Sequence, residues 1–562
     1  MRGESTLERK TVQTWDSQST SVRRDGWGTL LCLTFVFAAA CLMLFADLGK
    51  FPLFNPDEAL YAEPAREMLD TGEYVTTLLN YVVRYTKPPL VIWGMALSYK
   101  IFGVDEFAAR FLGAACAAIL VACTYLFVEK YCSRKSALIA SFALLTAPLY
   151  IGTAREAITD MPLSLFMAGS LMAFFHGYAQ KAGFWRWVGY VLTGLAVMTK
   201  GPVGLVLPVG ILGCYHILRG DLAPAWRYYK PLAGLLVVSV IAVPWFAVEI
   251  YQTKGAYYNE FLVRENFQRF TSVVDHKAPW WYHIAAVVGG MLPWSLFLPQ
   301  SLLAAFRAPK AVLYGAYGHL SDRQALPLFC ACWFLITLGF FSVSVSKLLP
   351  YTVPAFPAAA AVIGIYIEQA LDRHRRKALA VPLCILATCF AVAAFVAPML
   401  LAKLKEAPPD VSHLTQLALI CLFVGTIISL IALWRKHGDV AVAVFSGAIF
   451  CCLLTFGLRG MELASMQMEG PIPAFSRFAA LSPWPIIVYH MRKPSVPFYA
   501  HRQVVIPHNS EEFEKAIRTT NGAYVLGKRA DESYLVSMPR CRVIARQGLY
   551  VLVCQQPTGF SH

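Results

Sequence analysis

The sequence predicts a polytopic α-helical membrane protein with about 13 transmembrane helices and a small α/β domain at its C-terminal end. Hydrophobic residues make up 57% of the 562 residues and charged residues only 15%, whereas soluble domains carry roughly 25% charged residues. The mean hydropathy of +0.52 agrees with this. Apolar runs long enough to cross a bilayer recur along most of the chain. A soluble enzyme with a single membrane anchor is therefore excluded.

The apolar runs give the approximate limits of the expected spans. The first run remains a transmembrane helix, because it is too long for a signal peptide and lacks a small-residue cleavage pattern. The fifth and sixth runs are short and joined by a tight link. The expected spans are 27–47, 107–128, 136–152, 161–178, 184–199, 201–218, 231–249, 284–306, 325–343, 351–367, 378–402, 412–434 and 439–458.

Basic residues fall in alternate loops between these runs, which is the pattern of the positive-inside rule. One set of loops carries most of them, for example at Arg134, Lys135 and Arg186, and this set is assigned to the cytoplasm. With an odd number of spans, the N-terminus is cytoplasmic and the C-terminal domain periplasmic. The net charge of +15 then reflects membrane orientation, and we expect no nucleic-acid partner.

This alternation of the spans across the membrane divides the chain into two units. Residues 1–458 are expected to form the transmembrane catalytic domain, with periplasmic loops at 48–106 and 250–283, and residues 459–562 the C-terminal domain. Along 57–70, charged residues recur at helical spacing, which predicts a helix lying in the membrane interface.

The C-terminal domain is expected to contain several strands around one acidic helix at 510–519. Cys541 and Cys554 lie on either side of a Gln547-Gly548 turn in a compartment that is expected to be oxidising, so we expect a disulfide between them. The predicted strands are VVIPH, AYVLG, SYLVS, CRVIA and YVLVC.

The segment Asn55-Pro56-Asp57-Glu58 follows directly on the first apolar run. Two adjacent carboxylates therefore lie where a membrane segment enters water, which suits the handling of a lipid-borne substrate. The same pattern fits a capping box, with Asn55 as N-cap, Pro56 at the first helical position and Glu58 at the third. The local pattern alone favours the capping box, so both interpretations stay open.

Charged residues also lie alone on the outer side, where few basic residues are expected. A phosphate in a partly dry pocket needs several charge-assisted donors, and these cations would supply them. For each cation alone, anchoring to lipid head groups is the favoured explanation, but five or six together favour function. The candidates are Lys87, Arg155, Glu156, Asp160, Lys200, Arg264, Arg269, His276, Lys347 and Tyr351. Cysteine or histidine spacing typical of a metal site is absent.

Six blocks in this order resemble the bacterial ArnT-like branch of the protein O-mannosyltransferase superfamily. The resemblance covers roughly residues 50–360 and departs from the family pattern at Thr86, where an acidic residue is frequent. The blocks are PDEALYAEPAREML, YTKPPLVIW, AREAITDMPLSLF, GLAVMTKGPVGLVLP, RENFQRF with PWWYH and LPWS, and SKLLPYTVPAFPA.

The resemblance implies an inverting glycosyltransferase of the GT-C type in the bacterial inner membrane. The donor would be undecaprenyl phosphate carrying 4-amino-4-deoxy-L-arabinose and the acceptor lipid A, with Asp57, Glu58 and Asp160 as catalytic residues. No cofactor is required, a divalent metal stays open, and a monomer is expected. The alternatives are a related polyprenyl-phosphate-sugar transferase acting on core sugar or a protein hydroxyl, and a lipid or sugar transporter.

Overall fold

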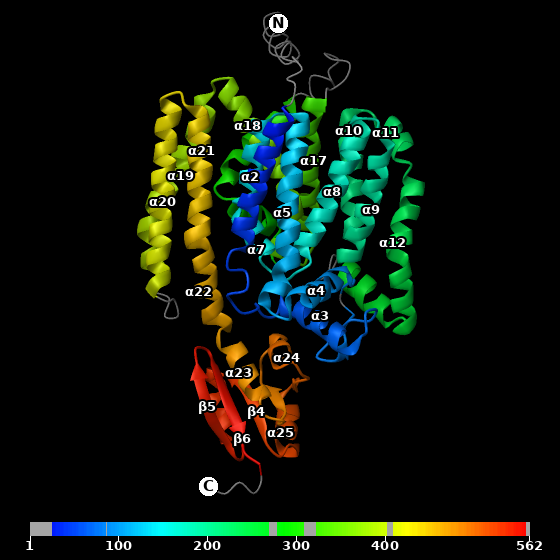
Figure 1. The fold of residues 1–562 in the computed structure, drawn as a ribbon, viewed down its shortest axis with the longest axis vertical. Helices are drawn as coiled ribbons and strands as arrows, with labels where there is room; N and C mark the ends of the chain where they lie inside the picture. The colour runs from blue at the N-terminus through cyan, green and yellow to red at the C-terminus, as the bar shows by residue number, and fades with distance from the viewer. Residues whose placement is uncertain (1–24, 86, 269–277, 308–321, 402–408, 558–562) are drawn as a thin grey trace, which may run out of the picture.

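The computed structural model describes residues 25–85, 87–268, 278–307, 322–401 and 409–557. Figure 1 shows a bundle of long helices, a layer of two shorter helices below it, and a small sheet-containing domain beyond that layer. The C-terminal strands thus lie at the end of the molecule opposite to the start of the first described helix.

The bundle is built mainly from long helices that run between its two ends (Figure 1). In chain order these are α2 (Gly26–Phe45), α5 (Glu106–Tyr131), α6 (Arg134–Leu145), α7 (Pro148–Ala154), α8 (Asp160–Ala179), α9 (Gly183–Lys200), α10 (Val203–Arg219), α11 (Leu222–Tyr229), α12 (Pro231–Gln252), η1 (Tyr258–Gln268), α14 (Tyr282–Gly290), η2 (Trp294–Phe297), α15 (Leu298–Ala305), α17 (Asp322–Val343), η3 (Leu349–Ala355), α18 (Phe356–Asp372), α19 (Arg376–Leu401), α20 (Pro409–Trp434), α21 (Gly438–Cys452), η4 (Leu453–Gly457) and α22 (Leu458–Glu469).

All the predicted apolar runs lie in helices. Among the described residues, eight helices are long and apolar enough to cross a membrane, and ten spans result if each of two bent pairs counts as one. Helices α8, α9 and α10 coincide with the remaining predicted runs. The chain is therefore a multi-pass membrane protein.

Two runs that were expected to be straight spans are broken. Run 136–152 is divided into α6 and α7, which meet at 65°, and run 284–306 into α14 and α15, which meet at 109° with η2 between them. Each break lies at a proline, Pro148 or Pro293. Proline lacks the backbone donor for a continuing helix and disfavours helical geometry in the residue before it.

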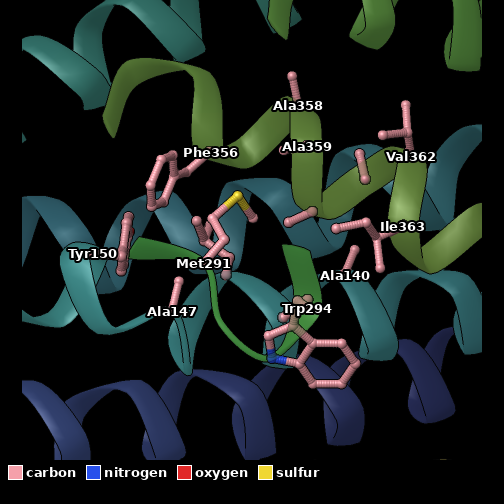
Figure 2. Close-up of a cluster of buried hydrophobic side chains, with 14 of the residues drawn as sticks. Ala140, Ala147, Tyr150, Met291, Trp294, Phe356, Ala358, Ala359, Val362 and Ile363 are labelled. Carbon is pink, nitrogen blue, oxygen red and sulfur yellow. The ribbon is translucent and has the colours of Figure 1, made fainter. Parts of the chain in front are cut away.

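The bundle core is packed through small residues. Figure 2 shows Ile363 of α18 beside Ala140 of α6, with Tyr150, Met291, Trp294 and Phe356 among the large side chains of the same cluster. A β-carbon added at Gly364 would lie 2.5 Å from the carbonyl oxygen of Ser136. Small residues at such contacts let membrane helices approach closely.

The two short helices below the bundle are α3 (Ala59–Thr71) and α4 (Leu90–Phe102), joined by a hairpin of β1 (Leu78–Leu79) and β2 (Val82–Val83). The helix predicted along 57–70 is present as α3, and three of its charged residues, Glu63, Arg66 and Glu67, are at most 1% exposed. Arg66 donates to both oxygens of Glu63, at 2.7 and 2.6 Å, so the charges are paired inside the protein.

The C-terminal domain has one four-stranded sheet with the order β3–β4–β6–β5, in which only the β3–β4 pair is parallel. Its elements are α23 (Pro471–Ala480), β3 (Ile486–Val488), α24 (Ser495–Ala500), α25 (Ser510–Thr519), β4 (Ala523–Lys528), η5 (Arg529–Asp531), α26 (Glu532–Ser537), β5 (Cys541–Gln547) and β6 (Tyr550–Gln555).

The structure agrees with the predicted strands at β4, β5 and β6 and with the predicted acidic helix at α25. The SYLVS segment was expected to be a strand and is helix α26, and strand β3 was missed. The VVIPH segment contributes one isolated bridge, between Val505 and Ile487.

The expected disulfide is also wrong. Cys541 and Cys554 are both free and buried. In the β5–β6 register Cys541 is opposite Gln555, and Cys554 is opposite Arg542. Because side chains alternate between the two faces of a sheet, this offset of one residue directs the two thiols to opposite faces.

Candidate active site at the outer end of the bundle

The loop between α2 and α3 carries Asp57 and Glu58. Glu58 is completely buried and forms a fork-shaped ion pair with Arg110 of α5, with Nε–Oε1 and Nη2–Oε2 distances of 2.7 Å. Its two oxygens also accept hydrogen bonds from the backbone amides of Phe54 and Ala157, each at 2.8 Å. The Glu58 carboxylate is thus occupied by protein donors.

Arg110 also holds the loop before the acidic pair. Its guanidinium donates to the carbonyl oxygens of Leu48, Phe51 and Pro52 at 3.0, 2.8 and 2.8 Å. Sequence analysis did not identify Arg110, although an arginine four residues into an apolar run is a signal of a buried partner.

The capping-box interpretation is wrong. Helix α3 begins at Ala59, with Glu58 in the N-cap position and no side-chain cap bond. The Asn55 side chain instead bonds to Glu469 and Ser495 near the C-terminal domain. Asp57 itself is exposed, so its carboxylate is presented at the surface of a loop held on both sides.

Acidic groups gather around Asp57. Burial, together with the negative charges of Glu58, Asp57 and Asp160, raises the pKa of Glu156 to about 8. Like charges close together oppose one another's ionisation. The turn between α7 and α8 therefore holds a carboxyl that is largely protonated at neutral pH beside the Asp57 loop.

Asp160, Lys200 and Tyr351 come together from three different helices, as the sequence predicted for one site. Asp160 begins α8 and accepts from Lys200 Nζ, the last residue of α9, at 2.6 Å. The Lys200 ammonium lies 4.4 Å from the ring centroid of Tyr351 in η3. Tyr61 of α3 lies in the electrostatic field of Asp160 and Lys200. Tyr61 was not identified from the sequence.

Lys87 is connected to this cluster through Glu265, whose charge acts on Arg84 beside Tyr61. Its ammonium pairs with Glu265 Oε2 of η1 at 3.3 Å, and both side chains are about 15% exposed. Arg84, three residues before Lys87, donates to the Leu60 carbonyl and lies 5.3 Å from the Tyr61 ring centroid. The predicted phosphate-binding cation therefore borders the Tyr61 side of the site.

Three other predicted substrate-binding residues, Arg155, Lys347 and Arg264, bond to protein groups outside this cluster. Arg155 is buried and donates to the carbonyls of Met43 and Leu44 at 3.2 and 3.0 Å, which caps the end of α2. Lys347 is buried and donates to the carbonyls of Ser342 and Ser344 at the end of α17.

Burial lowers the pKa of Lys347 below its usual value. Arg264 is 55% exposed and pairs with Glu260 one turn earlier in η1, at 2.9 Å. Arg269, His276 and Thr86 lie outside the described residues. In the parts of the chain that the structure describes, no group of three or more His, Cys, Asp or Glu residues could hold a metal ion.

Several known proteins resemble this chain in sequence and in fold. The family model of dolichyl-phosphate-mannose-protein mannosyltransferases matches residues 28–254. A protein of Shewanella sediminis, named undecaprenyl phosphate-alpha-4-amino-4-deoxy-L-arabinose arabinosyl transferase, is 30% identical over 345 residues, which are 60% of each chain. A protein of Aquifex aeolicus is 29% identical over 348 residues, which are 61% of this chain and 66% of that protein. The chain thus matches about three fifths of the length of these relatives.

The fold is shared over a longer stretch than the sequence. The crystal structure of ArnT from Cupriavidus metallidurans bound to undecaprenyl phosphate superposes with a TM-score of 0.80 and 25% identity, over 95% of this chain and 99% of that one. The apo form of the same protein gives a TM-score of 0.78. The family model, the curated relatives and this shared fold show that the chain has the GT-C fold of ArnT and resembles ArnT-named proteins in sequence over part of its length.

Proposed function

We propose that this protein transfers 4-amino-4-deoxy-L-arabinose from undecaprenyl phosphate to a phosphate of lipid A. The observation that carries the proposal is the fold shared, at a TM-score of 0.80, with ArnT bound to undecaprenyl phosphate. The site geometry supports it, because Asp160, Lys200 and Tyr351 come together, and Asp160 and Asp57 both act on the carboxyl of Glu156. The Lys87–Glu265 pair lies near Arg84, which in turn lies beside Tyr61.

The donor's leaving group is a lipid phosphate, which is already a weak base. It needs stabilisation of its negative charge and not a general acid. Lys87 and Lys200 are two cations that the described residues bring to the site, and the Lys200 ammonium lies 4.4 Å from the ring centroid of Tyr351. We infer that this group holds the phosphate, together with Arg269 in the adjoining part of the chain.

Asp57 has a different role in this proposal. A lipid A phosphate oxygen is anionic near neutral pH, so its attack on the sugar carbon requires no strong general base. The Asp57 carboxylate would orient the acceptor and stabilise positive charge that develops on the sugar. The sugar's ammonium group would find compensating charge at Asp57 and Asp160. A hydroxyl acceptor, in contrast, would need Asp57 as a true base.

Three of the predicted site residues are assigned to the scaffold of the site. Glu58, Arg155 and Lys347 are buried, and each forms hydrogen bonds to other groups of the protein. Glu58 then acts by holding the loop that carries Asp57, and Arg155 and Lys347 by capping helix ends.

We also propose the orientation and surroundings of the protein. The chain would lie in the bacterial inner membrane as a monomer, with a cytoplasmic N-terminus and with residues 459–562 in the periplasm. The basic residues in alternate loops support this orientation. Reporter fusions at Lys10 and Gly522 test it, and signals from the same side of the membrane would contradict it.

The proposed activity is tested by mass spectrometry of lipid A from cells with and without the gene. Cells with the gene should contain lipid A whose mass is increased by one aminoarabinose. The Asp57→Asn variant keeps the size of the side chain and removes its charge, so it should fold and lose transfer. Unmodified lipid A in both strains would refute the acceptor, and normal transfer by folded Asp57→Asn would refute the role of Asp57.

A further inference from the structure

The side chain of Asn55, two residues before Asp57, is bonded entirely to residues that lie more than 400 positions later in the chain. Its Nδ2 donates to Glu469 Oε2 at 2.9 Å and to Ser495 Oγ at 2.7 Å, and its Oδ1 accepts from the Ser495 amide at 3.1 Å. Both amide hydrogens and the carbonyl oxygen are therefore used. This loop residue is fixed to the start of α24 and the end of α22.

An ion pair between Lys493 and Glu469 supports this contact. Lys493 Nζ lies 2.7 and 2.8 Å from the two oxygens of Glu469, which is 3% exposed. The Lys493 ammonium also lies 5.2 Å from the ring centroid of Tyr550 in β6. Asn55 is thus connected through Glu469 and Lys493 to the sheet of the C-terminal domain.

Two further bonds reach the same loop from the same side. The hydroxyl of Tyr499 receives the amide hydrogen of Leu53 at 2.9 Å, and Ser465 Oγ donates to the Pro52 carbonyl at 3.3 Å. From the bundle side, Arg110 holds Glu58. The exposed Asp57 therefore lies between two anchored residues, one bound to each part of the protein.

We propose that Asn55, Glu469 and Lys493 are positioning residues, through which the C-terminal domain sets the place of the Asp57 carboxylate in the transfer reaction. The inference rests on the proposed role of Asp57 and extends it to the domain beyond the membrane. Catalysis depends steeply on such placement, because a group displaced by about 1 Å can lose roughly 100-fold in rate.

Domain docking alone does not require this network. Buried ion pairs are often no more stabilising than apolar residues of similar volume, and the same interface already contains apolar side chains such as Phe475 and Phe498. Hydrogen-bonded polar networks, in contrast, select one geometry because each donor needs its own acceptor. Such a network next to an exposed carboxylate is expected where a reactive group must be held in one position.

The test compares Lys493→Met with Lys493→Arg in a transfer assay with purified protein, undecaprenyl-phosphate-linked aminoarabinose and lipid A. The methionine removes the charge at similar length, and Glu469 then lacks its counter-charge and keeps only the bond from Asn55. We expect kcat to fall roughly 10- to 100-fold, with the KM for the donor changed by less than about twofold. Lys493→Arg should recover most of kcat, because it restores a cation.

The matched control is Arg546→Met. Arg546 also pairs with a glutamate in the C-terminal domain, Glu532, at 2.6 Å, but it is 52% exposed and its partner belongs to the same domain. The kcat of the Arg546→Met variant should equal that of the unchanged protein. Hydrogen–deuterium exchange of residues 52–58 should speed up in Lys493→Met and not in Arg546→Met.

A folded Lys493→Met protein with unchanged kcat, or a loss that is equal in Arg546→Met, would overturn the inference. If Lys493→Met does not fold, Asn55→Ala removes the same link from the loop side and is measured in the same way. Failure of both variants to fold would make the network a folding element and also overturn the inference. Asp57→Asn separates the two proposals, because its normal activity refutes the role of Asp57, whatever Lys493 does.

Discussion

Replacement of Arg110 by methionine should destabilise the protein more than any change to its surface ion pairs. Arg110 is completely buried and donates five hydrogen bonds, two to Glu58 and three to loop carbonyls. Methionine has a similar volume and no polar hydrogen. The variant therefore leaves one buried carboxylate without its counter-charge and three carbonyls without these donors.

The size of the effect follows from these contacts. Removal of one partner of a buried ion pair costs about 3–5 kcal/mol, and each lost carbonyl bond costs about 1 kcal/mol. The sum, about 6–8 kcal/mol, is comparable to the whole free energy of unfolding of a typical domain, about 5–15 kcal/mol. Arg110→Met should consequently be extracted from membranes mainly as unfolded or aggregated protein.

Thermal unfolding in detergent, followed with a cysteine-reactive fluorophore, measures this effect because Cys116, Cys330 and Cys332 are buried in the folded protein. Arg546→Met is the control, since an exposed pair contributes at most about 1 kcal/mol. The double variant Glu58→Met/Arg110→Met removes the unpaired charge and should regain part of the loss. If Arg110→Met melts at the temperature of Arg546→Met, the buried pair does not hold this loop.

Three further outcomes are expected. Lys87→Ala should weaken binding of undecaprenyl phosphate by about 1.5–3 kcal/mol, as measured by titration in detergent, whereas Lys100→Ala, an exposed cation at the end of α4, should not; equal affinities would remove Lys87 from the site. Burial and hydrogen bonding to Glu63 raise the pKa of Glu67 to about 8 from 4.5, so the folded state retains a proton that the unfolded chain loses. The melting temperature should therefore fall as the pH rises between these values, and a slope equally steep in Glu67→Gln would refute this origin. Cys541 and Cys554 should both be alkylated after denaturation without reduction, and protection of both would restore the disulfide.

The spans could be predicted because insertion into a bilayer depends on local hydropathy, which each segment carries in its own residues. The acidic helix α25 was predicted for a similar reason, since its apolar residues Phe513 and Ile517 recur at helical spacing between charged ones. The breaks at Pro148 and Pro293 were not predicted, although the prolines were visible. Proline is tolerated inside other helices of this chain, for example at Pro244 in α12, so its presence alone does not locate a break.

The pairings of the site could not be predicted in the same way. The sequence identified Asp160, Lys200 and Tyr351 only as charged or polar residues on one side of the membrane. The fold brings them together. The partner of Glu58 depends on where α5 lies relative to the loop 52 residues before Arg110. The cysteine register depends on a bulge between Val543 and Ala545, and the pattern of alternating residues contains no mark of it.

The contacts of the Asp57 loop also determine when in the life of the chain the site can be completed. The loop is synthesised within the first sixty residues, whereas its partners Glu469, Ser495 and Tyr499 follow 414, 440 and 446 residues later. Contacts of such long sequence separation form late, because the intervening chain must first be ordered. The helices are therefore inserted into the membrane before the site is complete, and the Asp57 loop gains its last contacts only when the C-terminal domain has folded.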